Sequence, residues 1–383
     1  MYDIAIIGAG ISGLYCATNL KDFNIILFES DRVGGRIWTH QNPQYEIGAG
    51  RFNRSHKILW SLIKKYNLEK DAIKIPSSKL YLETLENVEH DINKKMSILI
   101  DIELNNSIIE SLRKITFYQH AVNILGKDAE LLLNQYGYYS EFKVMNAYDA
   151  IRLFKTSNTF YVMKNGLQSI TDRMYKEIKK GLNIKYEKVT LVERIENGFN
   201  VNNIQAKNVI FTIPTSLLSS FSILNPFREY IKTPIIMPLL RIYADYGVDF
   251  GQKITTSSIL KYIIPITKTL VMISYTDGKN VTPYLNGKKL KSESIIKKMI
   301  KDELSKFIHV TEPTYFKCHY WPIGTHTWPT GINSDEIGDK MINPLPNIYI
   351  CGDGLSHKQG WMEGALETAK EVVDKIKYMD KLK

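Results

Sequence analysis

The feature that most constrains this chain is a glycine-rich turn directly after its first apolar segment. Residues 2–8 (YDIAIIG) form a short apolar run that predicts a buried parallel strand. Gly8, Gly10 and Gly13 stand in the pattern G-A-G-I-S-G, and helical apolar spacing follows at once. The first glycine allows a tight turn, the second lets backbone approach a pyrophosphate, and the third lets the helix pack on the sheet. This opening suits a dinucleotide, because a helix N-terminus attracts phosphate.

An acidic residue at the end of the next strand strengthens this interpretation. On its own, G-x-G-x-x-G could be a glycine-rich turn without a ligand. Residues 25–28 form a second apolar run, which Glu29 and Ser30 close. A carboxylate there accepts hydrogen bonds from ribose hydroxyls and repels a 2′-phosphate. A chance surface carboxylate would explain less well why Glu29 ends a strand at the spacing that the glycine motif requires.

A second glycine-rich element follows closely. Gly34 and Gly35, in RVGGR, can bring another stretch of backbone to the pyrophosphate, and Arg36 can neutralise its charge. An enzyme that binds NAD in a Rossmann fold has no need of a second element so near the first. The pattern therefore favours FAD as the dinucleotide.

With these motifs in order, the sequence resembles the FAD-dependent amine oxidase family, which includes monoamine, polyamine and L-amino-acid oxidases. The strongest matching motifs lie near both ends of the chain, and weaker ones lie between them. They are residues 31–36 (DRVGGR), 46–52 (EIGAGRF), 165–169 (NGLQS), 192–195 (VERI), 209–214 (VIFTIP), 350–354 (ICGDG) and 359–365 (QGWMEGA).

The resemblance implies one FAD, held without a covalent bond. Asp353 replaces the family's usual glutamate, and the backbone of Trp361 and Met362 would meet the pyrimidine edge of the flavin at a helix N-terminus. Cys318 is out of register with the cysteine of covalently flavinylated monoamine oxidases. The expected FAD contacts are Gly8, Gly10, Ser12, Gly13, Glu29, Ser30, Gly35, Arg36, Gly48, Ala49, Gly50, Arg51, Val192, Gly352, Asp353, Gly360, Trp361 and Met362.

The resemblance also implies an activity, namely oxidation of an amine or amino acid to an imine. Hydride would pass to flavin N5, with O2 as acceptor and H2O2 as product. Trp361 and Trp328 match the positions of aromatic side chains that flank the substrate, although buried tryptophans also serve as core packing. Arg241 stands where the family often has a lysine near the flavin. Arginine cannot act as a base, which puts ordinary oxygen reactivity in doubt.

Arg51 is a candidate for substrate choice. It matches an arginine of L-amino-acid oxidases that holds the substrate carboxylate, and such a bidentate pair selects amino acids over plain amines. The alternative is that Arg51 contacts only the flavin or an internal acid. Two other functions stay open: a flavin-binding protein without turnover, which Arg241 suggests, and an oxidase of another substrate such as a porphyrinogen.

The domain organisation follows from the motif positions. At about 150 residues per domain, 383 residues predict two or three domains. We expect an α/β protein, α+β overall, with a Rossmann-like FAD domain made of residues 1–75, 165–232 and 318–383. A substrate domain with a mixed sheet and helices would combine residues 76–164 and 233–317.

Composition limits the remaining partners. The net charge is +10, but the lysines are scattered, so we expect no nucleic acid. No apolar run reaches the roughly 18 residues of a membrane span, and no leader segment is visible. Cys16, Cys318 and Cys351 have no metal-site spacing, and so sparse a set suits a reducing, cytoplasmic compartment. The sequence predicts neither the oligomeric state nor the particular amine.

Overall fold

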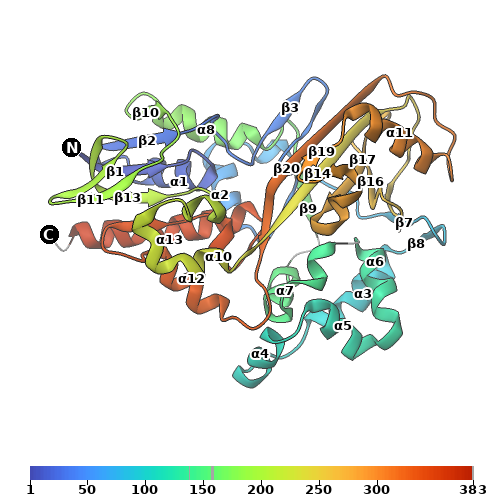
Figure 1. Ribbon diagram of the computed structural model, residues 1–383. Coiled ribbons are helices and arrows are strands. Elements are labelled where there is room, and N and C mark those ends of the chain that lie inside the picture. The colour runs from blue at the N-terminus through green and yellow to red at the C-terminus, as the bar shows by residue number, and fades with distance from the viewer. Residues whose placement is uncertain (138, 157–158, 382–383) are drawn as a thin grey trace. The chain divides into compact units, whose positions relative to one another are not determined.

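The chain divides into two compact units in the computed structural model, which describes residues 1–137, 139–156 and 159–381 (Figure 1). The first unit comprises Met1–Ile75, Thr156–Ile235 and Asn333–Lys383, and the second comprises Pro76–Lys155 and Ile236–Ile332. Each unit is therefore built from stretches that are far apart in the sequence.

A seven-stranded sheet forms the centre of the first unit. β1 (Tyr2–Ile7) lies between β2 (Ile25–Glu29) and β13 (Ile204–Phe211) and runs parallel to both. The sheet is completed by β10 (Asn183–Tyr186), β11 (Val192–Ile195), β12 (Gly198–Val201) and β21 (Ile348–Ile350). β21 is parallel to β13, so the segments after β1, β2 and β21 all emerge at one edge of the sheet.

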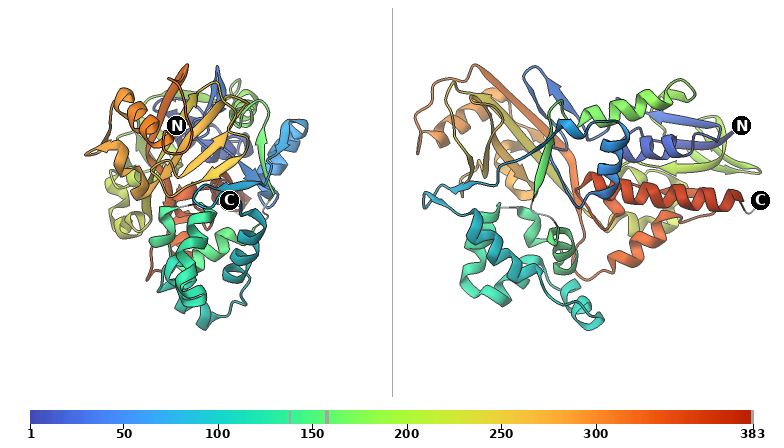
Figure 2. Two further views of the ribbon diagram at one scale, coloured as in Figure 1. Left: turned by 90° about the vertical axis from the view of Figure 1, so that its right-hand side faces the viewer. Right: turned by 180° about the vertical axis from the view of Figure 1, so that it is seen from behind.

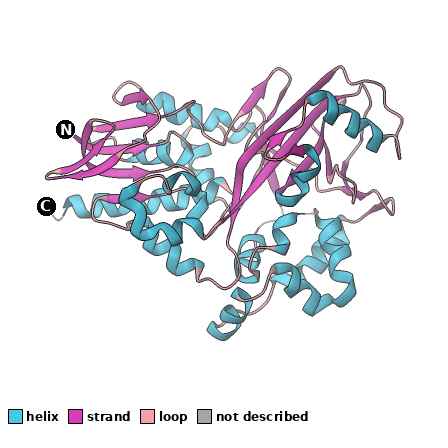
Figure 3. Ribbon diagram, in the orientation of Figure 1, coloured by secondary structure: helices cyan, strands magenta, loops and turns pink. Residues whose placement is uncertain are grey.

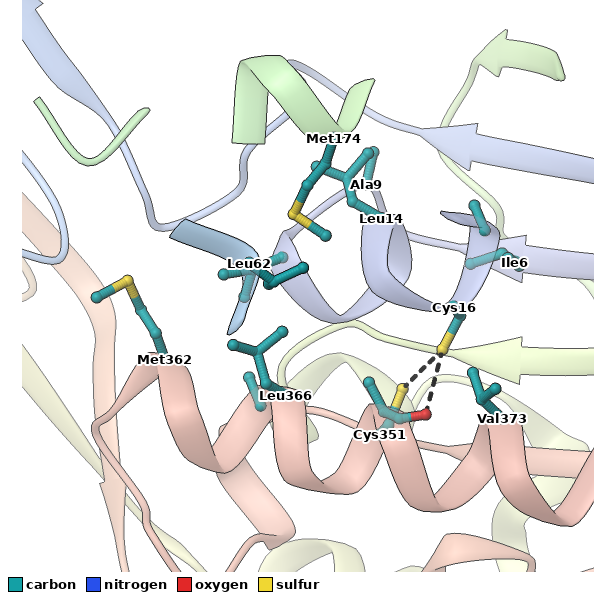
Figure 4. Packing of buried hydrophobic residues seen from close by; sticks show 14 of the residues in the cluster. Ile6, Ala9, Leu14, Cys16, Leu62, Met174, Cys351, Met362, Leu366 and Val373 are labelled. Atoms are coloured by element: carbon teal, nitrogen blue, oxygen red, sulfur yellow. Dashed lines mark hydrogen bonds between the residues drawn. The ribbon is translucent and has the colours of Figure 1, made fainter. Parts of the chain in front are cut away.

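Helices from both ends of the chain cover this sheet. α1 (Ile11–Asn19) packs against α13 (Met362–Lys381), and α8 (Gln168–Ile178) also contacts α1. The long α13 is clearest in the rear view of Figure 2. Figure 4 shows the packed side chains, among them Cys16 and Cys351, whose Sγ atoms are 3.8 Å apart.

Smaller elements complete the first unit. β9 (Phe160–Met163) pairs with β5 (Phe52–Asn53) and β6 (Ala72–Lys74), while β3 (Thr39–Gln41) and β4 (Gln44–Glu46) form a hairpin. The remaining helices are α2 (Lys57–Lys65), α9 (Thr215–Leu218), α10 (Arg228–Lys232) and α12 (Ser334–Ile342).

The second unit combines a mixed sheet with a group of helices, drawn in magenta and cyan in Figure 3. Along the sheet lie β20 (Tyr315–Thr327), β14 (Ile235–Asp245), β17 (Leu270–Asp277), β16 (Tyr262–Pro265), β15 (Lys253–Thr255), β7 (Lys79–Tyr81) and β8 (Glu86–Asn87). The helices are α3 (Glu89–Ile100), α4 (Asn106–Arg113), α5 (Phe117–Leu125), α6 (Ala129–Tyr136), α7 (Ala147–Phe154) and α11 (Glu293–Leu304), and β18 (Leu285–Asn286) pairs with β19 (Lys289–Leu290). Helices α3, α5, α6 and α7 share one hydrophobic core, and a second core packs α11 against the sheet.

The mixed α/β fold that the sequence predicts is confirmed, but three unit boundaries differ from the prediction. The smallest difference is at residues 233–235, which belong to the first unit. Residues 156–164 belong to the first unit, because β9 pairs with β5 and β6. Residues 318–332 belong to the second unit, because β20 pairs with β14 at the end of the second sheet. β20 was not predicted, since Pro322 and Gly324 interrupt its pattern as strand breakers do.

The helices and the metal-binding side chain types in residues 1–137, 139–156 and 159–381 bear on membrane and metal partners. None of the helices there combines the length and apolarity needed to cross a membrane. The same residues contain no group of three or more histidine, cysteine or acidic side chains placed to hold a metal ion.

Candidate functional site

The glycine turn between β1 and α1 has one glycine that packing requires and one that it does not. A Cβ atom on Gly13 would lie 2.0 Å from the carbonyl oxygen of Gly8, which would break the turn. A Cβ atom on Gly10 would meet only Cα of Gly35, at 4.0 Å. The protein itself therefore tolerates a side chain at Gly10, and the space beside it can take a ligand.

The second glycine-rich segment lies directly against this turn. The Gly34 N–H donates to the Ala9 carbonyl at 2.9 Å, and Gly35 adopts a positive φ of 56° beside Gly10. α1 begins here with Ser12 in its first turn, without an acidic residue or a capping side chain. The first N–H groups of a helix have no partner within the helix. This end of α1 can therefore bind phosphate.

Glu29 connects the second strand with the glycine turn. Its buried carboxylate accepts hydrogen bonds from the Ala9 N–H at 2.8 Å and the Asp31 N–H at 2.9 Å. The structure thus places this carboxylate beside the turn, while Ser30 is exposed, and the ribose contact of Glu29 stays a prediction.

Arg36 and Asp353 form an ion pair that joins the second glycine-rich segment to the C-terminal motif. Arg36 Nη1 lies 3.3 Å from Asp353 Oδ2, and Nη2 contacts Oδ1 more closely. The sequence assigned each residue to FAD separately and did not predict the pair. A buried carboxylate is unfavourable unless it is paired, so Arg36 offsets the cost of burying Asp353.

The segment Gly48, Ala49 and Gly50 runs along the backbone of Arg36. The Ala49 N–H donates to the Arg36 carbonyl at 2.9 Å, and a Cβ atom on Gly48 would lie 1.9 Å from that same oxygen. Glycine at this position is therefore required by the close approach of two backbone segments.

The remaining expected FAD contacts lie at other strand and helix ends of the first unit. Val192 begins β11 and is buried. Gly352 follows β21 by two residues with a φ of 143°, and Gly360 has a φ of 75° shortly before Met362 opens α13.

Arg51 lies beside two aromatic rings, in what we call the Arg51 cluster (Arg51, Phe160 and Trp361). The guanidinium carbon is 4.5 Å from the Phe160 ring centroid and 5.9 Å from that of Trp361. The two rings are nearly parallel, with 11° between their planes and 6.1 Å between centroids. All three side chains are partly exposed. Phe160 was not predicted, because only the pairing of β9 with β5 brings it here.

Two buried ionisable side chains lie next to Trp361, one against its ring and one two residues further along the chain. The His56 ring meets Trp361 edge to face, with centroids 4.9 Å apart. Burial, and secondly the charge of Lys358, lowers the pKa of His56 to about 4. Glu363 accepts the N–H groups of Ile58 and Leu59 at 2.8 and 3.0 Å and so caps α2 from another helix.

Neither of these two residues was predicted from the sequence. Burial raises the pKa of the Glu363 carboxyl, and the two N–H bonds offset part of that rise. The sequence offers one signal for each: His56 stands directly before the apolar helical pattern of α2, and Glu363 stands inside the motif QGWMEGA.

Trp328 and Arg241 both lie in the second unit. Trp328 is almost fully buried, and its carbonyl accepts the N–H of Asn146, the residue that caps α7. Arg241 on β14 stands opposite Tyr275 on β17, with its guanidinium 5.4 Å from that ring. Within this unit, Trp328 therefore has the surroundings of a core residue.

The turn, the uncapped helix and the buried Glu29 together define a dinucleotide-binding fold. The sequence matches the family of flavin-containing amine oxidoreductases over residues 11–377, and the chain belongs to that family. It is accordingly an FAD-dependent oxidoreductase.

Individual relatives are distant over the full length. The chain is 20% identical to an L-amino-acid oxidase from Trimeresurus stejnegeri across 95% of this chain and 85% of that one. A tryptophan 2-monooxygenase from Pseudomonas savastanoi is 44% identical, but only over 17% of this chain and 14% of its own length. A putrescine oxidase mutant structure superposes with a TM-score of 0.79 at 18% identity and covers 99% of both chains.

Proposed function

We propose that this enzyme oxidises amino acids to imino acids and that Arg51 binds the substrate carboxylate. The observation that carries the proposal is the partly exposed guanidinium of Arg51 beside Trp361. Near full-length similarity to an L-amino-acid oxidase supports it. In the same proposal the first unit holds FAD, while the roles of Arg241 and Trp328, both in the second unit, stay predictions.

The charge on Arg51 explains the preference for amino acids over amines. A guanidinium binds a carboxylate through two parallel hydrogen bonds. A hydrogen bond to a charged group contributes about 1.5–3 kcal/mol, which corresponds to roughly tenfold or more in affinity. An amine of the same shape without the carboxylate lacks this contribution.

The other residues have roles that need no acid or base at the reacting carbon. Gly10, the first turn of α1, Glu29 and Arg36 would hold the FAD, which supplies the acceptor for a hydride when bound. The Trp361 ring would orient the substrate and exclude water from it. Arginine side chains do not act as bases, so we expect no proton transfer from the substrate to Arg241. The substrate amine must therefore lose its proton before it reacts.

Anaerobic mixing tests the proposal. The oxidised enzyme is mixed with amino acids and with amines that differ from them only by the missing carboxylate, and the flavin absorbance is followed. We expect amino acids to reduce the flavin and the matched amines to do so weakly. Reduction by amines alone would contradict the role of Arg51.

The same experiment separates the alternatives. Air is admitted after reduction and peroxide is measured, which tests O2 as the acceptor. If nothing in a broad panel reduces the flavin, either a substrate of another class, such as a porphyrinogen, or a flavoprotein without turnover becomes the better description. Arg241, which stands where the family has a lysine, motivates the alternative of a flavoprotein without turnover.

Acid precipitation tests how the flavin is attached. Cys318 is partly exposed, and burial of its sulfur, together with the charge of Glu293, raises its thiol pKa to about 12. A thiol with so high a pKa is a poor nucleophile. We therefore expect a yellow protein that releases its flavin into the supernatant, and flavin retained in the pellet would contradict this.

A further inference from the structure

His56 is a buried, ionisable side chain to which the proposed function gives no role. It stands immediately before α2, yet its side chain does not cap that helix. The first-turn N–H groups of Ile58 and Leu59 are bound by Glu363 instead. This arrangement leaves the imidazole available to pack against Trp361.

The position of the imidazole restrains the Trp361 ring. The two rings meet at 65° with centroids 4.9 Å apart, an edge-to-face geometry that aromatic pairs prefer. Phe160 stacks nearly parallel to the same tryptophan at 6.1 Å. The Trp361 ring is thus held by a buried partner on one side and by a partly exposed partner on another.

The charge state of His56 suits this role. Nδ1 accepts the Asn53 N–H at 3.5 Å, so the ring can carry its single proton on Nε2. Burial and the Lys358 charge keep the imidazole neutral near pH 7. A neutral ring places no positive charge against Trp361, whereas a lysine at this position would.

We propose that His56 is a positioning residue that fixes the Trp361 ring for substrate binding and turnover. The role in turnover rests on the proposed function, but the contact itself does not. His56 is buried, while Arg51, Phe160 and Trp361 are partly exposed, so His56 acts through Trp361 rather than on the substrate.

Kinetics of four variants test the role in turnover. His56→Ala should lower kcat by about threefold to tenfold, the range that one aromatic pair supports, with a smaller change in KM. His56→Phe keeps a ring edge and should restore most of the loss. His56→Ala in a Trp361→Phe background should have little further effect, because contacting residues couple. Equal effects of His56→Ala in both backgrounds would overturn the proposal.

A spectroscopic experiment tests the contact between His56 and Trp361 even if no substrate is found. The near-ultraviolet circular dichroism of wild type minus Trp361→Phe isolates the Trp361 signal. His56→Ala should reduce this signal strongly. His40→Ala is the matched control, because His40 stacks on Tyr45 at 4.7 Å in the same unit and leaves Trp361 untouched. An unchanged Trp361 signal in a folded His56→Ala protein would show that His56 does not position the ring.

Discussion

The glycine turn and the Arg51 cluster differ in what fixes their geometry. At the turn, backbone approaches backbone, as where a Cβ atom on Gly13 would lie 2.0 Å from the Gly8 carbonyl. In the cluster, side chains from three separate segments meet, and the guanidinium of Arg51 lies 4.5 Å from the Phe160 ring centroid. Substitutions at the turn should therefore act through the fold or the cofactor, and those in the cluster through the substrate.

The largest effect is expected for Gly13→Ala. The new Cβ atom would collide with backbone that cannot move away without breaking β1 or α1, so the first unit should not fold. Far-ultraviolet circular dichroism and yield of the purified protein measure this. Gly181→Ala is the control, because nothing lies within 4 Å of its Cβ position, and it should behave as wild type. A folded Gly13→Ala protein would contradict the packing argument.

Gly10→Ala tests the second glycine of the same turn, where the cofactor rather than the packing is expected to exclude a side chain. Gly10 has an ordinary extended conformation, with φ −70° and ψ 179°, and its Cβ position is open. The protein should fold with an unchanged thermal midpoint when FAD is absent, yet it should contain little or no flavin, because the methyl group would occupy the space of the pyrophosphate. The ratio of flavin to protein absorbance measures the loss. Full flavin content would remove Gly10 from the cofactor site.

A pH-dependent stability is expected from His56. Its pKa falls from about 6.5 in the unfolded chain to about 4 in the folded one, so the unfolded chain takes up the proton first. With respect to His56, the protein has its full stability above pH 6.5. The free energy of unfolding falls by about 2–3 kcal/mol as the pH falls toward 4. Thermal midpoints of wild type and His56→Gln between pH 4 and 7 should show the wild type losing more stability. Parallel curves would contradict the low pKa.

The smallest effect on the protein is expected for Arg51→Gln, which should leave folding and flavin content unchanged. The half-saturation concentration for an amino acid should rise about tenfold or more, from loss of the charged hydrogen bonds. Arg54→Gln is the matched control, because Arg54 lies over Trp60 and Tyr161 rather than Trp361. Loss of flavin in Arg51→Gln would instead assign Arg51 to the cofactor.

The same difference between backbone and side-chain geometry explains what the sequence could predict. The sequence predicts the glycine pattern, Glu29 and Arg36, because each belongs to a motif whose residues lie close together or at a fixed spacing. The ion pair of Arg36 with Asp353 spans 317 residues and was not readable. Phe160 and His56 were missed for a similar reason, since their roles depend on strand pairing and helix packing between distant segments.

The boundary predicted at residue 318 differs from the observed one for a related physical reason. Strand β20 carries Pro322 and Gly324 and lacks clean alternation of buried and exposed residues, so its place in the second sheet could not be inferred. Trp328 follows that strand, and the sequence therefore placed it with the wrong stretch of chain.

The packing of α1 against α13 has a consequence for synthesis. The ribosome makes the chain from its N-terminus, and domains fold as units once their parts are present. α1 is made before β21 and α13, which follow it by more than three hundred residues. Until they emerge, the face of α1 that bears Cys16 lacks the partners shown in Figure 4. Nascent chains should therefore rely on chaperones to shield that apolar surface, and productive flavin loading should be one of the last steps of biogenesis.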